Sequence, residues 1–313
     1  MSGHKNLTEL MNYDLYSYFY GLVRQIPEGK VTTYGALARA LGDIVASRAC
    51  GYMLSLSRGN GQVPDYRVVR SDGYVGKYAH EQNSDERARK LNSEGFTLVN
   101  GKIQDFEKHL FDEFKTEYPL NAMREEQSRL SEKVSLDDDF SAESVAAIDV
   151  SYDDRYGYGV MAIRKDSGYE YRTVVQGVRF PYIPGYLAYR EFNFIQALAS
   201  GFDGLLLIDA SGYLHPRHIG LASFAGVVMD MPTIGISKSM LIGRSEGNWI
   251  YNNGERSGYI VNKREIVSPG HRISLDSSVR FIKDNYGDRY PAILKDVHNH
   301  TVKLRISAPR QSV

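Results

Sequence analysis

The chain has 313 residues, which is too long for one ordinary domain and suits two, and its 42% hydrophobic and 24% charged residues indicate a globular protein. Basic (38) and acidic (38) residues balance, so no global charge marks a polyanion partner, although local basic clusters still permit nucleic-acid binding. The single cysteine, Cys50, excludes an internal disulfide framework and a cysteine-based zinc site, and it predicts a reducing, cytoplasmic setting. The polar N-terminus and the short apolar runs predict neither a signal peptide nor a transmembrane helix, so no membrane partner is expected.

The first part of the chain is predicted to be helical. Residues 14–24 have an amphipathic pattern and lead into a turn at 26–30. Residues 32–42 begin with hydroxyl N-cap candidates, carry apolar residues at helical spacing and end at a glycine, and a further helix is expected over 45–56. This spacing is compatible with a helix-turn-helix, whose second helix can enter a groove of DNA.

The composition changes between residues 104 and 140, where the chain becomes charged and helical in propensity. The dipeptide Tyr118-Pro119 interrupts this stretch, and a helix is expected over 121–133. We therefore predict a first domain over 1–112, a linker over 113–118 and a second domain over 119–313.

The second domain is predicted to be an α/β domain with a mixed sheet. Two helices, at about 187–200 and from about 216, alternate with its later strands. The expected strands are 144–153, 156–166, 170–180, 204–210 and 232–239.

Three acids of this domain stand where a carboxylate is costly. Asp149 follows an apolar run inside a strand, Asp209 ends the strand GLLLI, and Glu191 begins the intervening helix. A single strand-end Asp often caps the next helix or turn, and that reading stays open for each acid alone. Acids that converge from adjacent strands suit Mg²⁺, which prefers oxygen ligands, and such a site can hydrolyse a phosphodiester.

Five motifs of this domain occur in a fixed order: AAIDVSY (146–152), FPYIPGYLAYRE (180–191), DASGYLHPRHIGLASFAG (209–226), PTIGISKS (232–239) and SPGHRISLDSS (268–278). Together they resemble endonuclease V, the deoxyinosine 3′ endonuclease family with a ribonuclease H-like fold. The resemblance covers about residues 119–305, and five ordered motifs over that length are not expected by chance.

This resemblance implies catalytic roles for five residues. Asp149, Glu191 and Asp209 match the family's metal-binding catalytic acids, which implies Mg²⁺ as the cofactor, with Mn²⁺ as a substitute. His215, in the HPR motif, and Lys238, in GISKS, match active-site positions near the scissile phosphate. A lysine there would neutralise charge that develops during phosphoryl transfer.

The resemblance also implies a fourth ligand and a base-binding surface. Asp296 aligns with the family's C-terminal metal ligand, although the usual Pro-Thr-Arg is missing before it. Tyr182 matches the wedge that fills the gap when a base leaves the stack, and flanking prolines stiffen its loop. Gly185, Gly212 and Gly235 match positions that line a tight hypoxanthine pocket with backbone groups.

Two residues depart from the family pattern. Ala210 replaces a glycine after the third acid and is expected to tighten or reshape the base pocket. Phe224 replaces a histidine and is expected to remove a polar group near the site. Neither change touches the acids, so both bear on specificity more than on activity.

The first domain contains four further motifs: IPEGKVTTYGALARALG (26–42), ASRACGYM (46–53), VPDYRVVRSDGYVGKYA (63–79) and LNSEGF (91–96). Together they are similar to the DNA-binding domain of O6-alkylguanine-DNA alkyltransferases, and this second resemblance covers about residues 12–108. The family's Pro-Cys-His-Arg becomes Pro64-Asp65-Tyr66-Arg67 here. A carboxylate is a poor alkyl acceptor and Tyr66 would not activate it as a histidine would, so alkyl transfer is predicted to be absent.

The DNA-binding residues of that family are retained. Tyr34 matches the tyrosine that rotates the target phosphate, Arg48 matches the arginine that replaces the extruded base, and Tyr78 matches a pocket residue near the alkylated oxygen. The first domain thus resembles the cysteine-less alkyltransferase-like proteins, which bind lesions without reversing them. The identity of Asp65 at the acceptor position has no explanation in the sequence.

Together the two resemblances predict a monomeric repair endonuclease that nicks DNA 3′ to deoxyinosine, at the second phosphodiester bond, by Mg²⁺-dependent hydrolysis. The first domain would bind O6-alkylguanine-type bases without catalysis. Two alternatives stay open: a non-catalytic lesion sensor that recruits other repair factors, and a nuclease that acts on inosine in RNA, because discrimination between the sugars depends on contacts to the 2′-OH.

Overall fold

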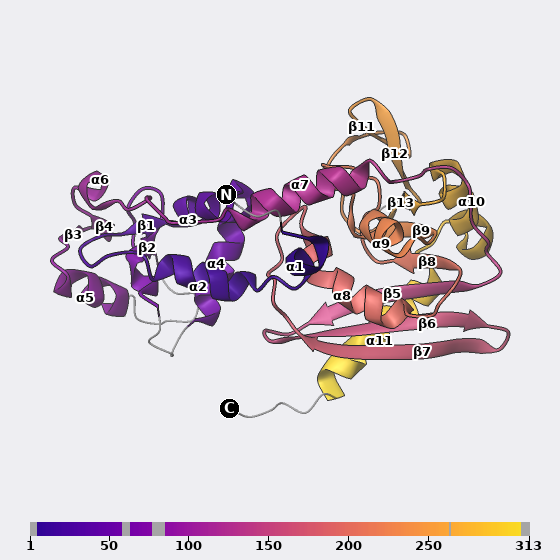
Figure 1. Cartoon of the computed structure of the whole chain (residues 1–313), viewed down its shortest axis with the longest axis horizontal. Helices are drawn as coiled ribbons and strands as arrows, with labels where there is room; N and C mark the ends of the chain where they lie inside the picture. Colours follow the sequence, from indigo (N-terminus) through magenta and orange to yellow (C-terminus); the bar gives the residue numbers. More distant parts are fainter. Residues whose placement is uncertain (1–4, 58–62, 77–84, 263, 308–313) are drawn as a thin grey trace. The chain divides into compact units, whose positions relative to one another are not determined.

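The structure is a computed structural model that describes residues 5–57, 63–76, 85–262 and 264–307 (Figure 1). It divides into two compact units. The first consists of Met1–Arg124 with Arg179–Pro184, and the second of Glu125–Val178 with Gly185–Val313. Across the described ranges, every helix is too short or too polar to traverse a lipid bilayer.

The first unit is mainly helical, as predicted. Two short sheets accompany its helices: β1 (Thr32–Thr33) pairs in parallel with β2 (Val68–Val69), and β3 (Leu98–Val99) pairs with β4 (Lys102–Ile103). Its helices and 3-10 turns are α1 (Leu7–Met11), α2 (Leu15–Val23), α3 (Tyr34–Leu41), η1 (Ile44–Ala46), α4 (Ser47–Leu56), η2 (Asp65–Arg67), α5 (Asp85–Ser93) and α6 (Phe106–His109).

Helices α3 and α4 form the predicted helix–turn–helix pair. Thr33 caps α3, because its hydroxyl accepts the backbone N–H of Ala36 at 3.0 Å. Gly42 ends α3 with φ +107°, a conformation that glycine adopts at little cost, and a Cβ there would lie 2.9 Å from the backbone N of Asn121. The buried residues of α3 and α4 are mostly apolar, and Arg48 of α4 is exposed.

Helix α7 (Pro119–Ser131) contains the boundary between the units and leads into the large sheet of the second unit. The sheet is mixed, as predicted, with nine strands in the order β10-β11-β12-β13-β9-β8-β5-β6-β7. Its parallel pairs are β5 with β8 and β8 with β9, and the remaining pairs are antiparallel. The strands are β5 (Val145–Tyr152), β6 (Tyr156–Lys165), β7 (Gly168–Gly177), β8 (Leu205–Ile208), β9 (Thr233–Ser237), β10 (Arg244–Glu246), β11 (Trp249–Asn252), β12 (Glu255–Ile260) and β13 (Ile266–His271).

The helices of this unit cover both faces of the sheet (Figure 1). They are α8 (Leu187–Ala199), α9 (Leu221–Met229), α10 (Leu275–Tyr286) and α11 (Ala292–Ser307). The helix expected from about residue 216 begins five residues later, because His218 has φ +52° and the N–H of Gly220 bonds the carbonyl of Gly212. Strands β10 to β13 and helices α10 and α11 were not predicted from the sequence.

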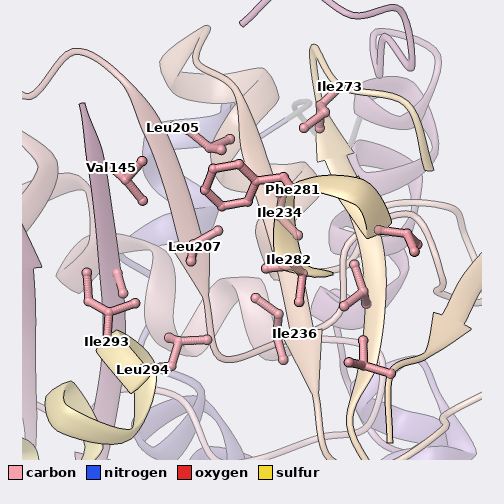
Figure 2. Packing of buried hydrophobic residues seen from close by; sticks show 14 of the residues in the cluster. Val145, Leu205, Leu207, Ile234, Ile236, Ile273, Phe281, Ile282, Ile293 and Leu294 are labelled. Carbon is pink, nitrogen blue, oxygen red and sulfur yellow. The ribbon is translucent and has the colours of Figure 1, made fainter. Parts of the chain in front are cut away.

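One core lies between the sheet and the helices α10 and α11 (Figure 2). Alternate residues of neighbouring strands face it, so each strand contributes an i, i+2 row. Each fully buried Leu, Ile, Val or Phe side chain contributes roughly 1.5–3 kcal/mol of burial free energy. The residues labelled in Figure 2 are Val145, Leu205, Leu207, Ile234, Ile236, Ile273, Phe281, Ile282, Ile293 and Leu294.

Candidate active site

The register of two parallel strands brings Asp149 and Asp209 together. Val145 pairs with Leu205 and Ala147 with Leu207, and both rows point toward the core under α10 and α11. Because side chains alternate along a strand, the next residue in each row is Asp149 or Asp209. Both carboxylates therefore emerge at the end of the same apolar rows, on the face that α11 covers.

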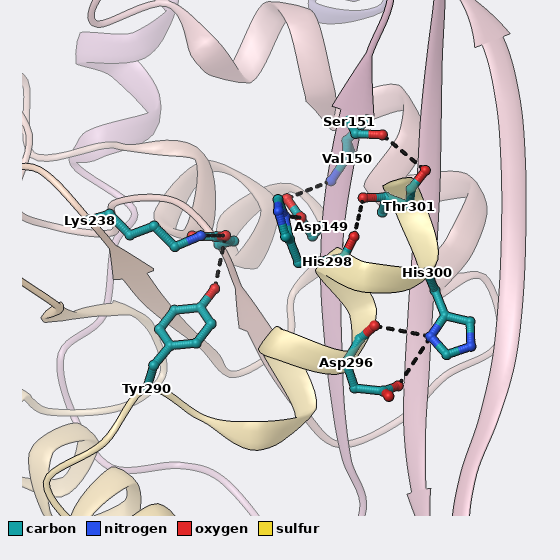
Figure 3. Close-up of polar contacts among 10 residues, drawn as sticks. Asp149, Val150, Ser151, Lys238, Tyr290, Asp296, His298, His300 and Thr301 are labelled. Atoms are coloured by element: carbon teal, nitrogen blue, oxygen red, sulfur yellow. Dashed lines mark hydrogen bonds and ion pairs between the residues drawn. The ribbon is translucent and has the colours of Figure 1, made fainter. Parts of the chain in front are cut away.

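Three side chains form a group that could hold a metal ion. A carboxylate oxygen of Asp149, a carboxylate oxygen of Asp209 and a ring nitrogen of His298 all lie within 4.8 Å of one another. His298 Nδ1 lies 2.8 Å from Asp149 Oδ2 (Figure 3). Carboxylate oxygens and an imidazole nitrogen are ligands that divalent cations accept.

Asp296, the expected C-terminal ligand, lies outside this group, and His298 of the same helix lies within it. The Asp296 carboxylate accepts a hydrogen bond from the Tyr171 hydroxyl at 2.6 Å. It also lies 3.4 Å from Nδ1 of His300 (Figure 3). Two positions along an α-helix rotate a side chain by about 200°, so residues 296 and 298 of α11 point to opposite sides. The geometry thus favours His298 over Asp296 as the C-terminal member of the site.

Glu191 stands close to this group in helix α8. Burial, followed by the negative charge of Asp149, raises the pKa of Glu191 to about 8. Burial and the charge of Asp209 also raise the pKa of Asp149. Among the residues that the structure describes, the group within 4.8 Å omits Glu191, although the charges of Asp149 and Asp209 both raise the pKa of its carboxyl.

Lys238 and Tyr290 both contact Asp209. Lys238 Nζ lies 2.7 Å from Asp209 Oδ2, and the Tyr290 hydroxyl donates to the same oxygen at 2.9 Å (Figure 3). The Lys238 ammonium also lies 4.9 Å from the centre of the Tyr290 ring. Lys238 was expected at the site from its motif, whereas Tyr290 was not, since no motif spacing relates residue 290 to the strand that precedes Asp209.

His215 is buried in the second unit and is 3% exposed. Its Nε2 lies 3.2 Å from the carbonyl oxygen of Gly185, and its Nδ1 accepts the backbone N–H of Arg217 at 3.2 Å. Burial, followed by the charge of Arg217, lowers the pKa of His215 to about 3. The imidazole is therefore neutral at ordinary pH, with both ring nitrogens engaged.

The three candidate pocket glycines lie where a larger residue does not fit. A Cβ at Gly212 would collide with the carbonyl oxygen of Pro269, and one at Gly235 would collide with the backbone N of Gly212. Gly185 has φ +81°, and a Cβ there would meet the Arg217 guanidinium at 3.0 Å. Close backbone packing accounts for glycine at these positions, and their contact with a base stays a prediction.

Tyr182 points outward from a loop whose neighbouring apolar residues point inward. Its side chain is 57% exposed, whereas Phe180 and Ile183 are buried. Two prolines restrict the backbone around it, since each fixes one φ angle. An exposed aromatic ring on a restrained loop fits the expected wedge.

The two departures from the family pattern have structural counterparts. Phe224 is fully buried in α9, with its ring 5.8 Å from that of Tyr189 and 5.2 Å from that of Phe192. It therefore acts as a core residue of the α8–α9 packing. Ala210 is buried, and a Cβ at Gly235 would collide with its carbonyl oxygen.

In the first unit, Tyr66 stands at the position of the alkyltransferase histidine and is hydrogen-bonded to a glutamate. The Tyr66 hydroxyl donates to Glu94 at 2.6 Å, and Arg67 forms a buried ion pair with the same carboxylate at 2.5 Å. Burial, followed by the hydrogen bond to Glu94, raises the pKa of Tyr66. Asp65, half-buried, begins the η2 turn that this network supports. The sequence analysis quoted the LNSEGF motif without assigning a role to Glu94.

Arg48, Tyr34 and Cys50 are further residues of the first unit that the structure describes. Arg48 is exposed on α4, and Tyr34, at the start of α3, lies 3.7 Å from the position of a Cβ at Gly51. Cys50 is fully buried, and burial raises the pKa of its thiol. Tyr78 lies outside the described residues.

Comparisons with known proteins agree with both halves of this picture. The family model described as "Endonuclease V" matches residues 128–299. The chain belongs to the endonuclease V family. A second model, "6-O-methylguanine DNA methyltransferase, DNA binding domain", matches residues 14–96.

Two relatives match nearly the whole length of this chain, and a solved structure matches part of it. The chain is 48% identical to the "Bifunctional methyltransferase/endonuclease" of Picrophilus torridus, over 95% of this chain and 98% of that protein. It is 30% identical to the "Bifunctional methyltransferase-like/endonuclease" of Nanoarchaeum equitans, over 92% of this chain and 87% of that protein. The crystal structure of endonuclease V from Streptomyces avermitilis superposes with a TM-score of 0.55 and 26% identity, covering 60% of this chain and 93% of that one.

The second unit of this endonuclease V is therefore a DNA endonuclease, and the first carries an alkyltransferase-type DNA-binding domain. Endonuclease V is a metal-dependent nuclease, and Asp149, Asp209 and His298 provide an acidic group that could bind the ion.

Proposed function

We propose that this endonuclease V nicks DNA 3′ to deoxyinosine, at the second phosphodiester bond, by Mg²⁺-dependent hydrolysis. The observation that carries the proposal is the convergence of Asp149 and Asp209, from two parallel strands, with His298. Glu191, whose pKa is raised to about 8 beside them, is the third acid.

The donor set fits a Mg²⁺ site. Burial and mutual repulsion raise the pKa of both Asp149 and Glu191, so the carboxylates are held together at an electrostatic cost that a divalent cation would relieve. Mg²⁺ takes oxygen ligands and keeps several waters, and Mn²⁺ accepts the same oxygens with an imidazole. When bound, such an ion supplies Lewis-acid activation of the phosphate and of the attacking water.

The side chains around the acids have separate roles in this proposal. Tyr290 orients Asp209 through its 2.9 Å hydrogen bond, and His298 orients Asp149 through its 2.8 Å contact. Lys238 is 49% exposed, whereas its partner Asp209 is 11% exposed. The ammonium can therefore reach an incoming phosphate and stabilise the negative charge that develops on it.

The target base would be recognised after it has left the base stack of the duplex. Tyr182 would enter the gap that the extruded base leaves, and the aromatic contact would offset part of the unstacking cost. Gly212 and Gly235 would present backbone groups to hypoxanthine, because the absence of side chains permits close approach.

Strand scission of a labelled duplex containing one deoxyinosine tests the proposal. Wild type should cut at the second phosphodiester bond on the 3′ side in Mg²⁺, and Asp209→Asn should give no incision above background. Asp203→Asn, which makes the same change at an exposed position near β8, is the matched control and should cut like wild type. Incision by Asp209→Asn at the wild-type rate would remove Asp209 from the mechanism.

The same assay separates the alternatives. A strand with inosine in RNA, matched in sequence, measures the preference between sugars. Tight binding of deoxyinosine duplex without incision in Mg²⁺ or Mn²⁺ would indicate a lesion sensor instead of a nuclease.

We further propose that the first unit binds O6-alkylguanine-type bases without removing the alkyl group. Asp65 occupies the acceptor position, and the hydroxyl of Tyr66 is already committed to Glu94. Cys50 cannot substitute, because its thiol is buried and burial raises its pKa, so thiolate is not available for attack.

Binding and incision can be separated with two point variants of the full chain. Arg48→Ala should weaken binding to duplex containing O6-methylguanine, because the exposed arginine on α4 would no longer replace the extruded base. Arg89→Ala removes an exposed arginine from α5 and is the control. Deoxyinosine incision should be the same in both variants, and unchanged O6-methylguanine affinity in Arg48→Ala would contradict the assignment.

A further inference from the structure

Three side chains donate to one backbone oxygen, the carbonyl of Gly185. Gln127 Nε2 donates to it at 3.0 Å, His215 Nε2 lies 3.2 Å from it, and a terminal nitrogen of Arg217 forms a short hydrogen bond to it. The donors come from α7 and from the segment after β8, so residues far apart in the sequence meet at this atom.

The three donor residues also form hydrogen bonds with one another. Arg217 Nε donates to Gln127 Oε1 at 2.9 Å, and the backbone N–H of Arg217 donates to His215 Nδ1 at 3.2 Å. The second bond assigns the proton of His215 to Nε2, where it faces the Gly185 oxygen. With Gln127 1% exposed and His215 3% exposed, the network is shielded from water and each bond in it is strengthened.

Gly185 stands at the end of the loop that carries Tyr182. Only Ile183 and Pro184 separate the two residues, and Ile183 is fully buried. The ring of Pro184 fixes one φ angle and Ile183 is buried, so rotation of the backbone between the clamped carbonyl and the exposed tyrosine is restricted. The position of the carbonyl therefore limits the position of the Tyr182 ring.

We propose that Gln127, His215 and Arg217 form a clamp on the Gly185 carbonyl and are positioning residues for base extrusion. The inference rests on the proposed function, and it assigns His215 to the loop instead of the scissile phosphate. The clamp keeps the Tyr182 loop in one conformation, so that the ring enters the stack without a further ordering cost.

The test compares cleavage of deoxyinosine in duplex and in single-stranded DNA, since only the duplex requires a wedge. Gln127→Glu removes the donor to Gly185 but keeps an oxygen that accepts from Arg217. Its kcat/KM on duplex should fall about tenfold or more, as expected for a lost buried hydrogen bond in a charged network, whereas single-strand kcat/KM should stay within about threefold. Gln196→Glu, on the exposed side of α8, is the matched control and should leave both values unchanged.

Arg217→Lys provides a second variant. Lysine keeps the charge but lacks the planar guanidinium group that bonds both Gln127 and Gly185. The loss of kcat/KM on duplex DNA should therefore persist. Equal losses on both substrates in these variants would show a general structural role, and no loss on either would also overturn the clamp.

Hydrogen exchange supplies a readout that is independent of cleavage. In Gln127→Glu, the amides of Ile183, Gly185 and Tyr186 should exchange faster, and those of α10 should keep wild-type rates. Unchanged exchange over 183–186 would refute the clamp even if wild type proves inactive on deoxyinosine, which would refute only the proposed function.

Discussion

The ammonium group of Lys238 lies 2.7 Å from a carboxylate oxygen of Asp209, although the two residues are 29 positions apart in the chain. The contact follows from the sheet. Asp209 comes directly after β8 and Lys238 directly after β9, and these neighbouring strands are parallel, so their C-terminal ends lie at the same edge. The lysine thus contacts Asp209 while about half of its side chain stays exposed.

Replacement of Lys238 should separate catalysis from metal binding. In Lys238→Met, the single-turnover rate of nicking should fall by about 10²–10³, the cost of losing one group that stabilises transition-state charge. Apparent affinity for Mg²⁺ should stay the same or become tighter, because a competitor for Asp209 is removed. Lys303→Met, on an exposed position of α11, is the control. A rate loss accompanied by much weaker metal binding would instead mean that Lys238 organises the metal site.

Metal binding should release a proton from Glu191. The pKa of this buried acid is raised to about 8, so below that pH it carries a proton that a cation must displace. Apparent Mg²⁺ affinity should therefore tighten as pH rises toward 8 and level off above it. Calorimetric titration at pH 7 in buffers of different ionisation enthalpy measures the released protons. Glu191→Gln should abolish that part of the release, and an unchanged count would show that another group loses the proton.

The neutral imidazole of His215 should make the second unit acid-sensitive. Its pKa is lowered from 6.5 to about 3, so between these values the unfolded chain binds a proton that the folded protein does not. The stabilisation is complete above pH 6.5 and decreases as the pH falls toward 3.

Comparison with a variant isolates this contribution. Between pH 7 and pH 5, the free energy of unfolding of wild type should fall by about 2 kcal/mol more than that of His215→Gln, in which an amide can donate to Gly185. Urea unfolding followed by the fluorescence of Trp249, the single tryptophan of the chain, reports on the second unit. Parallel pH profiles of the two proteins would contradict the assignment.

Restoration of alkyl transfer should require two changes in the first unit. Asp65→Cys supplies a thiol, but Tyr66 has a raised pKa and donates to Glu94, so it cannot act as a base for the thiol. The double variant Asp65→Cys, Tyr66→His adds an imidazole that Glu94 can orient, and it should accept methyl groups at least about tenfold faster than the single variant. Transfer of labelled methyl from O6-methylguanine DNA to protein measures this. Equal rates in the two variants would show that Tyr66 does not limit the chemistry.

Much of the architecture could be predicted from local patterns. The continuous apolar runs before Asp149 and Asp209 indicate two buried strands, each followed by an acid, and that inference does not depend on the rest of the fold. The helix–turn–helix pair follows from a hydroxyl cap at Thr33 and a glycine at position 42, both of which act within one turn of backbone. Neither inference required knowledge of which elements are neighbours.

Other features depend on helix phase and on packing between distant segments. Helix α11 was not predicted from the sequence. Asp296 and His298 differ by about 200° around its axis, and only the packing of α11 on the sheet places His298 beside Asp149. The partners Tyr290, Glu94 and Gln127 have no motif of their own, because each acts on a residue that chain folding brings to it. The order of residues along this chain was enough to predict two domains and the candidate acids of the second. The hydrogen bonds that orient the acids and hold the Gly185 carbonyl were decided by the tertiary structure, since a hydrogen bond depends on distances of a few tenths of an ångström that no local pattern encodes.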